Sequence, residues 1–196
     1  PESESEPLRV RVTTSLGDIV IELDETRAPL SVANFLRYVD EKGFNNTIFH
    51  RVIVGFVVQG GGKYIDMSEA PDFEEVYNEA DNGLLNVRGA VALARYDAID
   101  SATREFFINV ADNPTLDHSE QSCTRQEVAD VEKARLKGLI KPLTCDTFGY
   151  SVFGHVISGM DVVDLVEIGE THSSHDSDDV PLRPIVILNV DRLDAR

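Results

Sequence analysis

The sequence predicts a mainly-β fold that closes into an antiparallel barrel. Strand-like segments recur along most of the chain, and only two segments have the periodicity of a sizeable helix. Near the start, Val10 and Val12 alternate with arginines, and an alternating segment at 19–23 follows the turn residues Gly17 and Asp18, as is typical of a β-hairpin. A closed barrel pairs every strand on both sides, so it leaves no exposed strand edge.

The two helices are predicted before and after the strand-rich middle of the chain. Pro29 suits the first turn of a helix and Gly43 is a natural C-terminal stop. The apolar residues between them recur at helical spacing, at Val32, Phe35, Leu36 and Val39. A second, shorter helix is predicted over residues 161–167, with apolar residues Val162, Val163, Leu165 and Val166. The chain then closes on a last strand over residues 184–193, with Ile185, Ile187 and Leu188.

Length and charge limit the class of protein. A chain of 196 residues that is 42% hydrophobic is most simply one domain, which we place at residues 8–196 after an acidic, unstructured leader at residues 1–7. The net charge of −17 argues against binding to nucleic acid or to an anionic membrane surface. No apolar segment is long enough to span a bilayer. We expect a monomer that engages neither nucleic acid nor membrane.

The segment 49–62, FHRVIVGFVVQGGG, places one obligate cation inside an otherwise apolar strand–turn–strand. Arg51 stays charged at physiological pH and is costly to bury unless something pairs with it. Alternation over residues 56–59 places Gln59 near the arginine, and the glycines at 60–62 end the strand. On this segment alone, Arg51 has either a structural partner or a function.

This segment resembles the signature of the cyclophilins, the cyclosporin-binding class of peptidyl-prolyl cis–trans isomerases. Further motifs agree with it in the family's order: GAVALAR at 89–95, SATREFFIN at 101–109, and FGYSVFG at 148–154 followed by SGMDVV at 158–163. The resemblance extends over residues 8–193 apart from one insert, and the chain is most similar to the bacterial periplasmic branch. It implies a barrel of eight strands with a helix over each open end.

The resemblance implies isomerisation of X–Pro peptide bonds in unfolded or extended protein segments, which assists folding. An X–Pro bond isomerises against a barrier of about 20 kcal/mol set by amide resonance, and no bond breaks, so no cofactor or metal is needed. By resemblance, Arg51 is the catalytic residue that stabilises the twisted amide. The substrate-binding residues are then Phe56, Val57, Phe107, Leu116 and Tyr150 around the proline ring, with Gln59, Ala94, Arg95 and Glu105 beside the peptide.

Three residues depart from the family pattern at the site. Glu105 stands where the best-known members have glutamine, and if its carboxylate faces Arg51 it would neutralise part of the cation's field and lower turnover. Thr115 stands where eukaryotic members have a tryptophan, so we expect weak cyclosporin binding at most. Tyr150 replaces the family's common histidine, as in many bacterial relatives.

The insert over residues 118–147 stands where bacterial relatives have a short turn. A capping box at Thr124–Glu127 predicts an amphipathic helix that ends near Gly138, with apolar residues Val128, Val131 and Leu139. The chain's two cysteines, Cys123 and Cys145, lie near the ends of the insert, and we expect a disulfide that closes it. A disulfide implies a periplasmic or otherwise exported protein, and two free thiols in a cytoplasmic protein are the alternative.

Other interpretations stay open beside these. Taken singly, Phe56 and Phe107 are plain core residues, and His50 is structural because the reaction needs no general base. The segment 171–179, THSSHDSDD, is a solvated acidic loop or an adventitious metal site. A peptide-binding or chaperone module would use the same pocket with little turnover, an alternative that Glu105 keeps open. A scaffold would instead use the insert helix to dock a partner.

Overall fold

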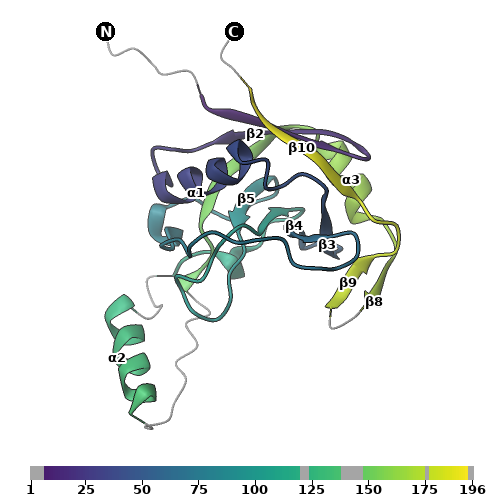
Figure 1. The fold of residues 1–196 in the computed structure, drawn as a ribbon. Coiled ribbons are helices and arrows are strands. Elements are labelled where there is room, and N and C mark those ends of the chain that lie inside the picture. The colour runs from purple at the N-terminus through teal and green to yellow at the C-terminus, as the bar shows by residue number, and fades with distance from the viewer. Residues whose placement is uncertain (1–6, 120–123, 138–147, 175–176, 194–196) are drawn as a thin grey trace, which may run out of the picture.

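The computed structural model describes residues 7–119, 124–137, 148–174 and 177–193. Eight strands form the predicted closed barrel, and every neighbouring pair is antiparallel (Figure 1). Around the barrel the order is β1 (Arg9–Thr14), β10 (Val186–Leu193), β3 (Thr47–Ile53), β4 (Val57–Tyr64), β6 (Phe106–Asn109), β5 (Ala90–Leu93), β7 (Val152–Ser158) and β2 (Gly17–Leu23).

The first hairpin forms as predicted, but its turn lies two residues earlier than expected. Thr14 pairs with Gly17, so the turn is Ser15–Leu16 and Gly17 is already the first residue of β2. The Thr14 hydroxyl accepts the backbone N–H groups of Leu16 and Gly17 at 3.1 and 3.2 Å. This side chain satisfies the turn, and a sequence pattern based on Gly17 and Asp18 does not reveal it.

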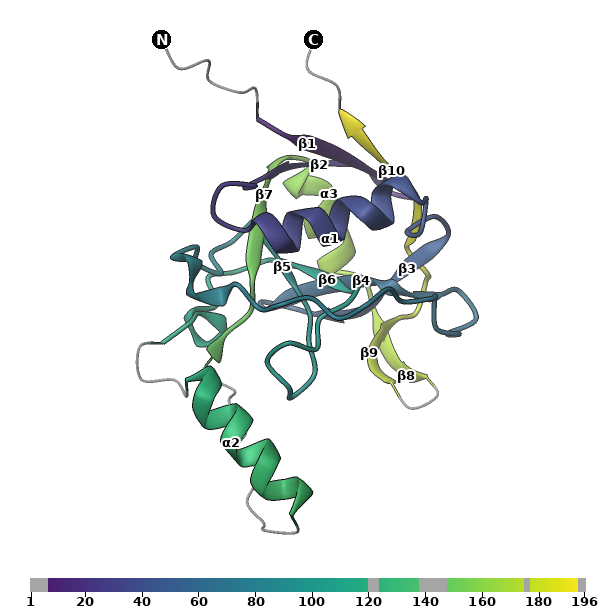
Figure 2. The ribbon, with the colours of Figure 1, turned by 60° about the vertical axis from the view of Figure 1, so that its left-hand side comes forward.

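Two helices pack against the barrel. Helix α1 (Pro29–Asp40) contacts β7 and β10, and α3 (Met160–Glu167) contacts β2, β3 and β4. Figure 2 shows α1 in front of the barrel and α3 behind it. The predicted stop of α1 at Gly43 is displaced, because the helix ends at Asp40 and Lys42 adopts the left-handed conformation at φ 56°. The backbone N–H of Gly43 still donates to the Tyr38 carbonyl at 2.8 Å.

The core fills the space between the strands and α1. It is built around phenylalanine rings in contact: the centroid of Phe35 lies 5.0–5.5 Å from those of Phe44, Phe106 and Phe153, edge to face with Phe106 and tilted to the other two. Buried valines and isoleucines of β1, β2 and β10 complete it. Along β1 and β2 these inward residues alternate with more exposed ones, whereas every residue of β5 and β6 is buried. A second, smaller apolar cluster contains Val57, Ala90, Ala92, Phe107 and Val152.

The described part of the insert is a helix that stands off from the barrel (Figures 1 and 2). Helix α2 (Arg125–Leu136) begins at the predicted capping box, in which the Thr124 N–H donates to Glu127 Oε2 at 2.7 Å and the Glu127 N–H to Thr124 Oγ1 at 3.3 Å. It ends two residues before Gly138, and Leu136 is 89% exposed. The expected Cys123–Cys145 disulfide lies outside the residues that the structure describes. Leu139 and the side chains of Val128 and Val131, which were predicted to form the apolar face of the helix, lie outside them as well.

The segment predicted as a solvated acidic loop at 171–179 instead contributes to a small hairpin. Strands β8 (Thr171–Ser174) and β9 (Ser177–Pro181) pair with His172 opposite Val180. The alternation of exposed polar residues with Val180 was too short to indicate strands. Within the described ranges, no three His, Cys, Asp or Glu residues are placed to hold a metal ion. None of the described helices is long and apolar enough to cross a membrane.

Candidate active site

Strands β3 and β4 bring Arg51 and Gln59 together. The two residues are paired across the strands, and Arg51 Nη1 donates to Gln59 Oε1 at 3.1 Å. The pairing of β3 shifts on both sides of Phe49, an irregularity that redirects side chains along a strand. Within the described chain no carboxylate forms an ion pair with Arg51. One bond to a neutral amide leaves most of its five N–H donors available to a ligand.

A pocket of about 320 Å³ lies over this pair on the outside of the barrel. An apolar cluster forms its floor and walls, with the rings of Phe107 and Tyr150 edge to face at 5.6 Å between centroids. Nine of the sequence-predicted residues line it: Arg51, Phe56, Val57, Gln59, Ala94, Arg95, Phe107, Leu116 and Tyr150. The pocket therefore combines an arginine that is not ion-paired with an apolar surface, from segments far apart in the sequence.

The tenth predicted residue, Glu105, lies in an adjoining cavity of about 100 Å³ that shares Gln59, Ala94 and Arg95 with the pocket. Its carboxylate contacts Gln59 and His50 rather than Arg51. Glu105 Oε2 accepts Gln59 Nε2 at 2.7 Å and lies 3.4 Å from His50 Nε2. Among the described contacts, the Glu105 carboxylate therefore does not pair directly with Arg51, which is the contact through which it was expected to lower turnover.

Glu105 controls the orientation of Gln59. Burial alone would raise the pKa of Glu105, but the hydrogen bond and charge of His50, the bond from Gln59 and the charge of Lys63 outweigh it, and the net pKa lies below the usual 4.5. The group is therefore ionised at neutral pH and can only accept hydrogen bonds. Gln59 must turn its NH2 group toward Glu105, which leaves its carbonyl oxygen for Arg51.

Glycine at position 62 makes room for this carboxylate. A Cβ on Gly62 would lie 2.0 Å from Glu105 Oε1 and 2.5 Å from its Cδ, so any side chain would displace Glu105. His50 is buried beside it, 5% exposed, and no group in the described chain bonds to its Nδ1. The prediction that the glycines at 60–62 end the strand is wrong, because β4 continues through them to Tyr64. The last of these glycines instead makes room for the Glu105 carboxylate.

The far wall of the pocket depends on Tyr150. Its backbone N–H donates to the Leu116 carbonyl at 3.0 Å, and the Arg95 guanidinium lies 4.7 Å from the centroid of its ring. On the near side, Asn113 Nδ2 donates to the Phe56 carbonyl at 2.9 Å. Asn113 is only 7% exposed and supports this side of the pocket. The sequence does not reveal this role, because a lone asparagine beside a proline indicates a turn.

Arg104 is a buried structural arginine of this fold. Its side chain is buried, and it donates to the carbonyl oxygens of Gly61 at 2.7 Å, Pro71 at 2.6 Å and Gly43. Burial lowers the pKa of Arg104 below its usual value. Its partners are carbonyl groups from three separate segments, and no sequence motif predicts such an arrangement.

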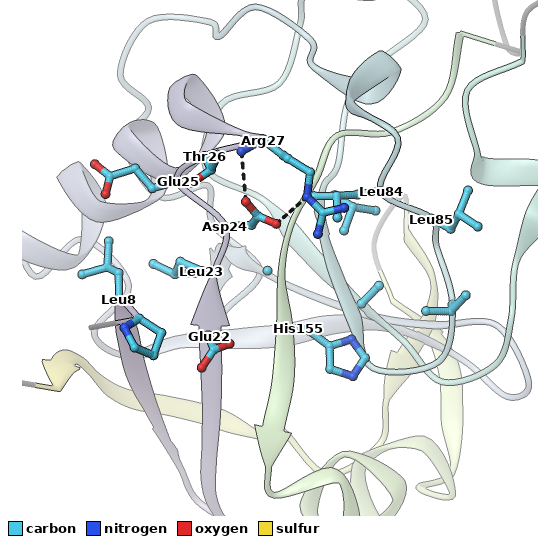
Figure 3. A pocket seen from close by; sticks show the side chains of 15 residues that line it. Leu8, Glu22, Leu23, Asp24, Glu25, Thr26, Arg27, Leu84, Leu85 and His155 are labelled. Carbon is cyan, nitrogen blue, oxygen red and sulfur yellow. Dashed lines mark hydrogen bonds and ion pairs between the residues drawn. The ribbon is translucent and has the colours of Figure 1, made fainter. Parts of the chain in front are cut away.

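A larger pocket of about 620 Å³ lies elsewhere, along β2, β7 and the loop at residues 84–87 (Figure 3). It contains none of the predicted residues. The backbone N–H of Arg27 donates to Asp24 Oδ1 at 2.9 Å, and its Nε donates to Asp24 Oδ2 at 2.7 Å. Glu22 Oε2 accepts Arg9 Nη2 at 2.8 Å. Because these charges satisfy one another, size alone does not make this pocket the better candidate.

Comparison with known proteins identifies the family of the chain. The family model described as cyclophilin type peptidyl-prolyl cis-trans isomerase/CLD matches residues 9–192. Peptidyl-prolyl cis-trans isomerase A of Dickeya dadantii is 44% identical over 178 residues, which are 91% of this chain and 80% of that protein. Peptidyl-prolyl cis-trans isomerase B of Escherichia coli is 44% identical over 177 residues, 90% of this chain and 94% of that one.

The fold agrees as well. The crystal structure of a cyclophilin type peptidyl-prolyl cis-trans isomerase of Cryptosporidium parvum superposes with a TM-score of 0.68 over 97% of this chain and 99% of that one, at 22% identity. The family match spans the eight barrel strands, and the motifs that suggested the resemblance meet at one pocket. The chain belongs to the cyclophilin family and is a peptidyl-prolyl cis–trans isomerase.

Proposed function

We propose that Arg51 is the catalytic residue and that it stabilises the twisted X–Pro amide. Twisting removes amide resonance and localises the lone pair on the prolyl nitrogen, so a fixed donor near that nitrogen binds the twisted state better than either planar isomer. The observation that carries the proposal is that, among the described residues, Arg51 bonds to a neutral amide, that of Gln59. Gln59 holds the guanidinium at 3.1 Å and leaves its charge uncompensated beside an apolar pocket.

The apolar wall of the pocket is proposed to hold the proline ring. Phe107 and Tyr150 present ring edges and faces to it, and Phe56, Val57 and Leu116 close the sides. The peptide before the proline would run past Gln59, Ala94 and Arg95 toward the adjoining cavity that contains Glu105. A related Cryptosporidium structure was crystallised in the presence of the dipeptide Ala-Pro, which supports a proline-containing ligand.

The substrates are proposed to be unfolded or extended protein segments, whose folding the enzyme assists. The alternative function, a chaperone or peptide-binding module with little turnover, depends on a carboxylate that neutralises Arg51. Glu105 instead bonds to Gln59 and faces His50, which favours turnover over mere binding. No metal or cofactor is required by a reaction that only rotates a bond.

Compartment, assembly and drug binding are proposed from sequence features. We place the protein in an exported compartment such as the periplasm, with a Cys123–Cys145 disulfide, and expect a monomer. Weak cyclosporin binding at most is proposed because Thr115, an exposed residue at the edge of the pocket next to Leu116, offers neither the surface nor the N–H donor of an indole.

The experiment that tests the catalytic proposal is a protease-coupled assay on a proline tetrapeptide. Arg51→Ala should lose roughly two to three orders of magnitude in kcat/KM, and Arg51→Lys should recover little because a point charge cannot reproduce the fork. Arg183→Ala is the matched control, since it removes the same charge from an exposed position. A folded Arg51→Ala protein within about threefold of wild type would overturn the assignment.

A further inference from the structure

Arg125, the first residue of helix α2, reaches back from the insert into a socket on the barrel. Its Nη1 donates to both carboxylate oxygens of Asp100 at 2.6 Å, and its Nη2 donates to the Asn78 carbonyl. Its guanidinium carbon lies 3.2 Å from the centroid of the Tyr77 ring and 5.0 Å from that of Phe148. The Arg125 side chain is 24% exposed and that of Asp100 is 42% exposed, so this is a partly desolvated, charge-assisted anchor in which two aromatic rings lie against the guanidinium.

The socket continues into a connected set of hydrogen bonds beneath it. Asp100 Oδ1 also accepts the Asn78 N–H at 2.8 Å, so one carboxylate holds both the arginine and this loop. The Asn78 side chain is buried and donates to the Gly149 carbonyl at 3.2 Å and the Ile99 carbonyl at 3.1 Å. Its oxygen accepts the Ser151 hydroxyl at 2.9 Å. Asn78 thus holds the residues on both sides of Tyr150.

From Gly149 the same set of bonds reaches the pocket. The Gly149 carbonyl accepts Arg95 Nε at 3.0 Å, and the Arg95 guanidinium lies over the Tyr150 ring. Tyr150 and Arg95 both line the pocket that holds Arg51. A continuous path of hydrogen bonds and ring contacts therefore joins the insert to the far wall of the pocket. These contacts position backbone groups, the Arg95 side chain and the Tyr150 ring, and none of them involves Arg51.

We propose that Arg125 is a positioning residue for this wall: by clamping Asp100 and Asn78, the insert holds Tyr150 and Arg95 in the conformation that accepts the proline ring. The proposal rests on the proposed role of the pocket. It gives the insert a function in substrate affinity, although its helix projects away from the barrel (Figure 1).

The clamp acts on binding rather than on the chemical step. The proline ring occupies the wall in the cis, trans and twisted states alike, so a loosened wall weakens all three equally. Loss of such uniform binding raises KM and leaves kcat unchanged. If the binding-competent wall is populated only part of the time, the apparent affinity falls by that fraction.

The test compares Arg125→Ala with Lys133→Ala, which removes the same charge from an exposed position of the same helix. We expect Arg125→Ala to raise KM roughly threefold to tenfold with kcat within about twofold, and Lys133→Ala to change neither. The Kd of an Ala-Pro tetrapeptide, followed by NMR, should rise in parallel. The resonances of Arg95 Nε–H and the Tyr150 amide should move only in Arg125→Ala.

Asp100→Asn provides a second route if Arg125→Ala does not fold. It retains an acceptor for the Asn78 N–H but removes the charge that holds the guanidinium, and we expect a smaller rise in KM of the same kind. A folded variant with unchanged KM, or a loss confined to kcat, would overturn the proposal. Should Arg51→Ala also retain full activity, the pocket itself would be misassigned; should Arg51→Ala alone be inactive, only the role of Arg125 fails.

Discussion

Replacing Glu105 with glutamine changes one charge in a buried hydrogen-bond chain while keeping its shape. The carboxylate is 25% exposed and the His50 side chain beside it 6%, so little solvent screens the interaction. Its bond from Gln59 Nε2 is 2.7 Å long, in the range of charge-assisted bonds. Hydrogen bonds to a charged partner contribute roughly 1 kcal/mol more than neutral ones, so Glu105→Gln should lower the free energy of unfolding at pH 7 by about that amount.

The loss in stability should depend on pH in a defined direction. The folded pKa of Glu105 lies below the usual 4.5, because the bonds and charge of His50 and Gln59 overcome the opposing effect of burial. A depressed acid pKa stabilises the fold in full above the unfolded value, and this stabilisation is lost as the pH falls through the folded value. Urea unfolding of both proteins should therefore show a constant gap from pH 7 to about pH 5 that closes at lower pH.

Activity distinguishes two roles of this carboxylate. Glu105→Gln retains a carbonyl oxygen that can accept Gln59 Nε2, so Gln59 can keep its orientation toward Arg51. Because the substitution also takes a negative charge away from the site, kcat/KM should stay unchanged or rise. The matched control is Glu69→Gln, an exposed carboxylate lining the same adjoining cavity. A loss of more than about tenfold with the fold intact would show that Glu105 positions Arg51 through Gln59, and the expectation would be wrong.

Two further predictions concern the rim and the insert. Cyclosporin should bind at least about 30-fold more weakly than to a relative with the rim tryptophan, and Thr115→Trp should recover part of the affinity; tight inhibition of the unmodified protein would refute this. Protein purified from its native compartment and denatured without reductant should show no thiol that reacts with Ellman's reagent. Reduction should lower Tm but not activity, because the proposed Cys123–Cys145 bridge stabilises the fold by roughly 3 kcal/mol. Two reactive thiols would instead show that the cysteines are not bridged.

The barrel could be predicted from the sequence because each of its strands carries a local pattern. Alternation at Val10 and Val12 and the helical spacing from Val32 to Val39 both survive in the structure. Ends of elements were less predictable, since they depend on side-chain bonds such as the one from the Thr14 hydroxyl that closes the first turn. The hairpin β8–β9 was missed because its strands are short and almost entirely polar.

The candidate site, like the fold, could be predicted from the sequence only in part. The residues that line the pocket come from contiguous motifs, so the family pattern places Arg51 and Phe107 without knowledge of their contacts. What the sequence could not give is pairing between motifs: that Glu105 bonds to Gln59, and that Arg125 of the insert bonds to Asp100. Those partners lie 46 and 25 positions apart, and only the closed barrel brings them together.

The central claim is that Arg51 acts on the twisted amide more than on either planar isomer, and the rate of isomerisation on the enzyme tests it most directly. NMR exchange spectra of an Ala-Pro tetrapeptide at saturating protein separate this rate from affinity. Arg51→Ala should bind the peptide within about tenfold of wild type while the bound interconversion slows by roughly 100-fold to 1,000-fold. A bound rate within about threefold of wild type, or a loss found only in affinity, would contradict the account.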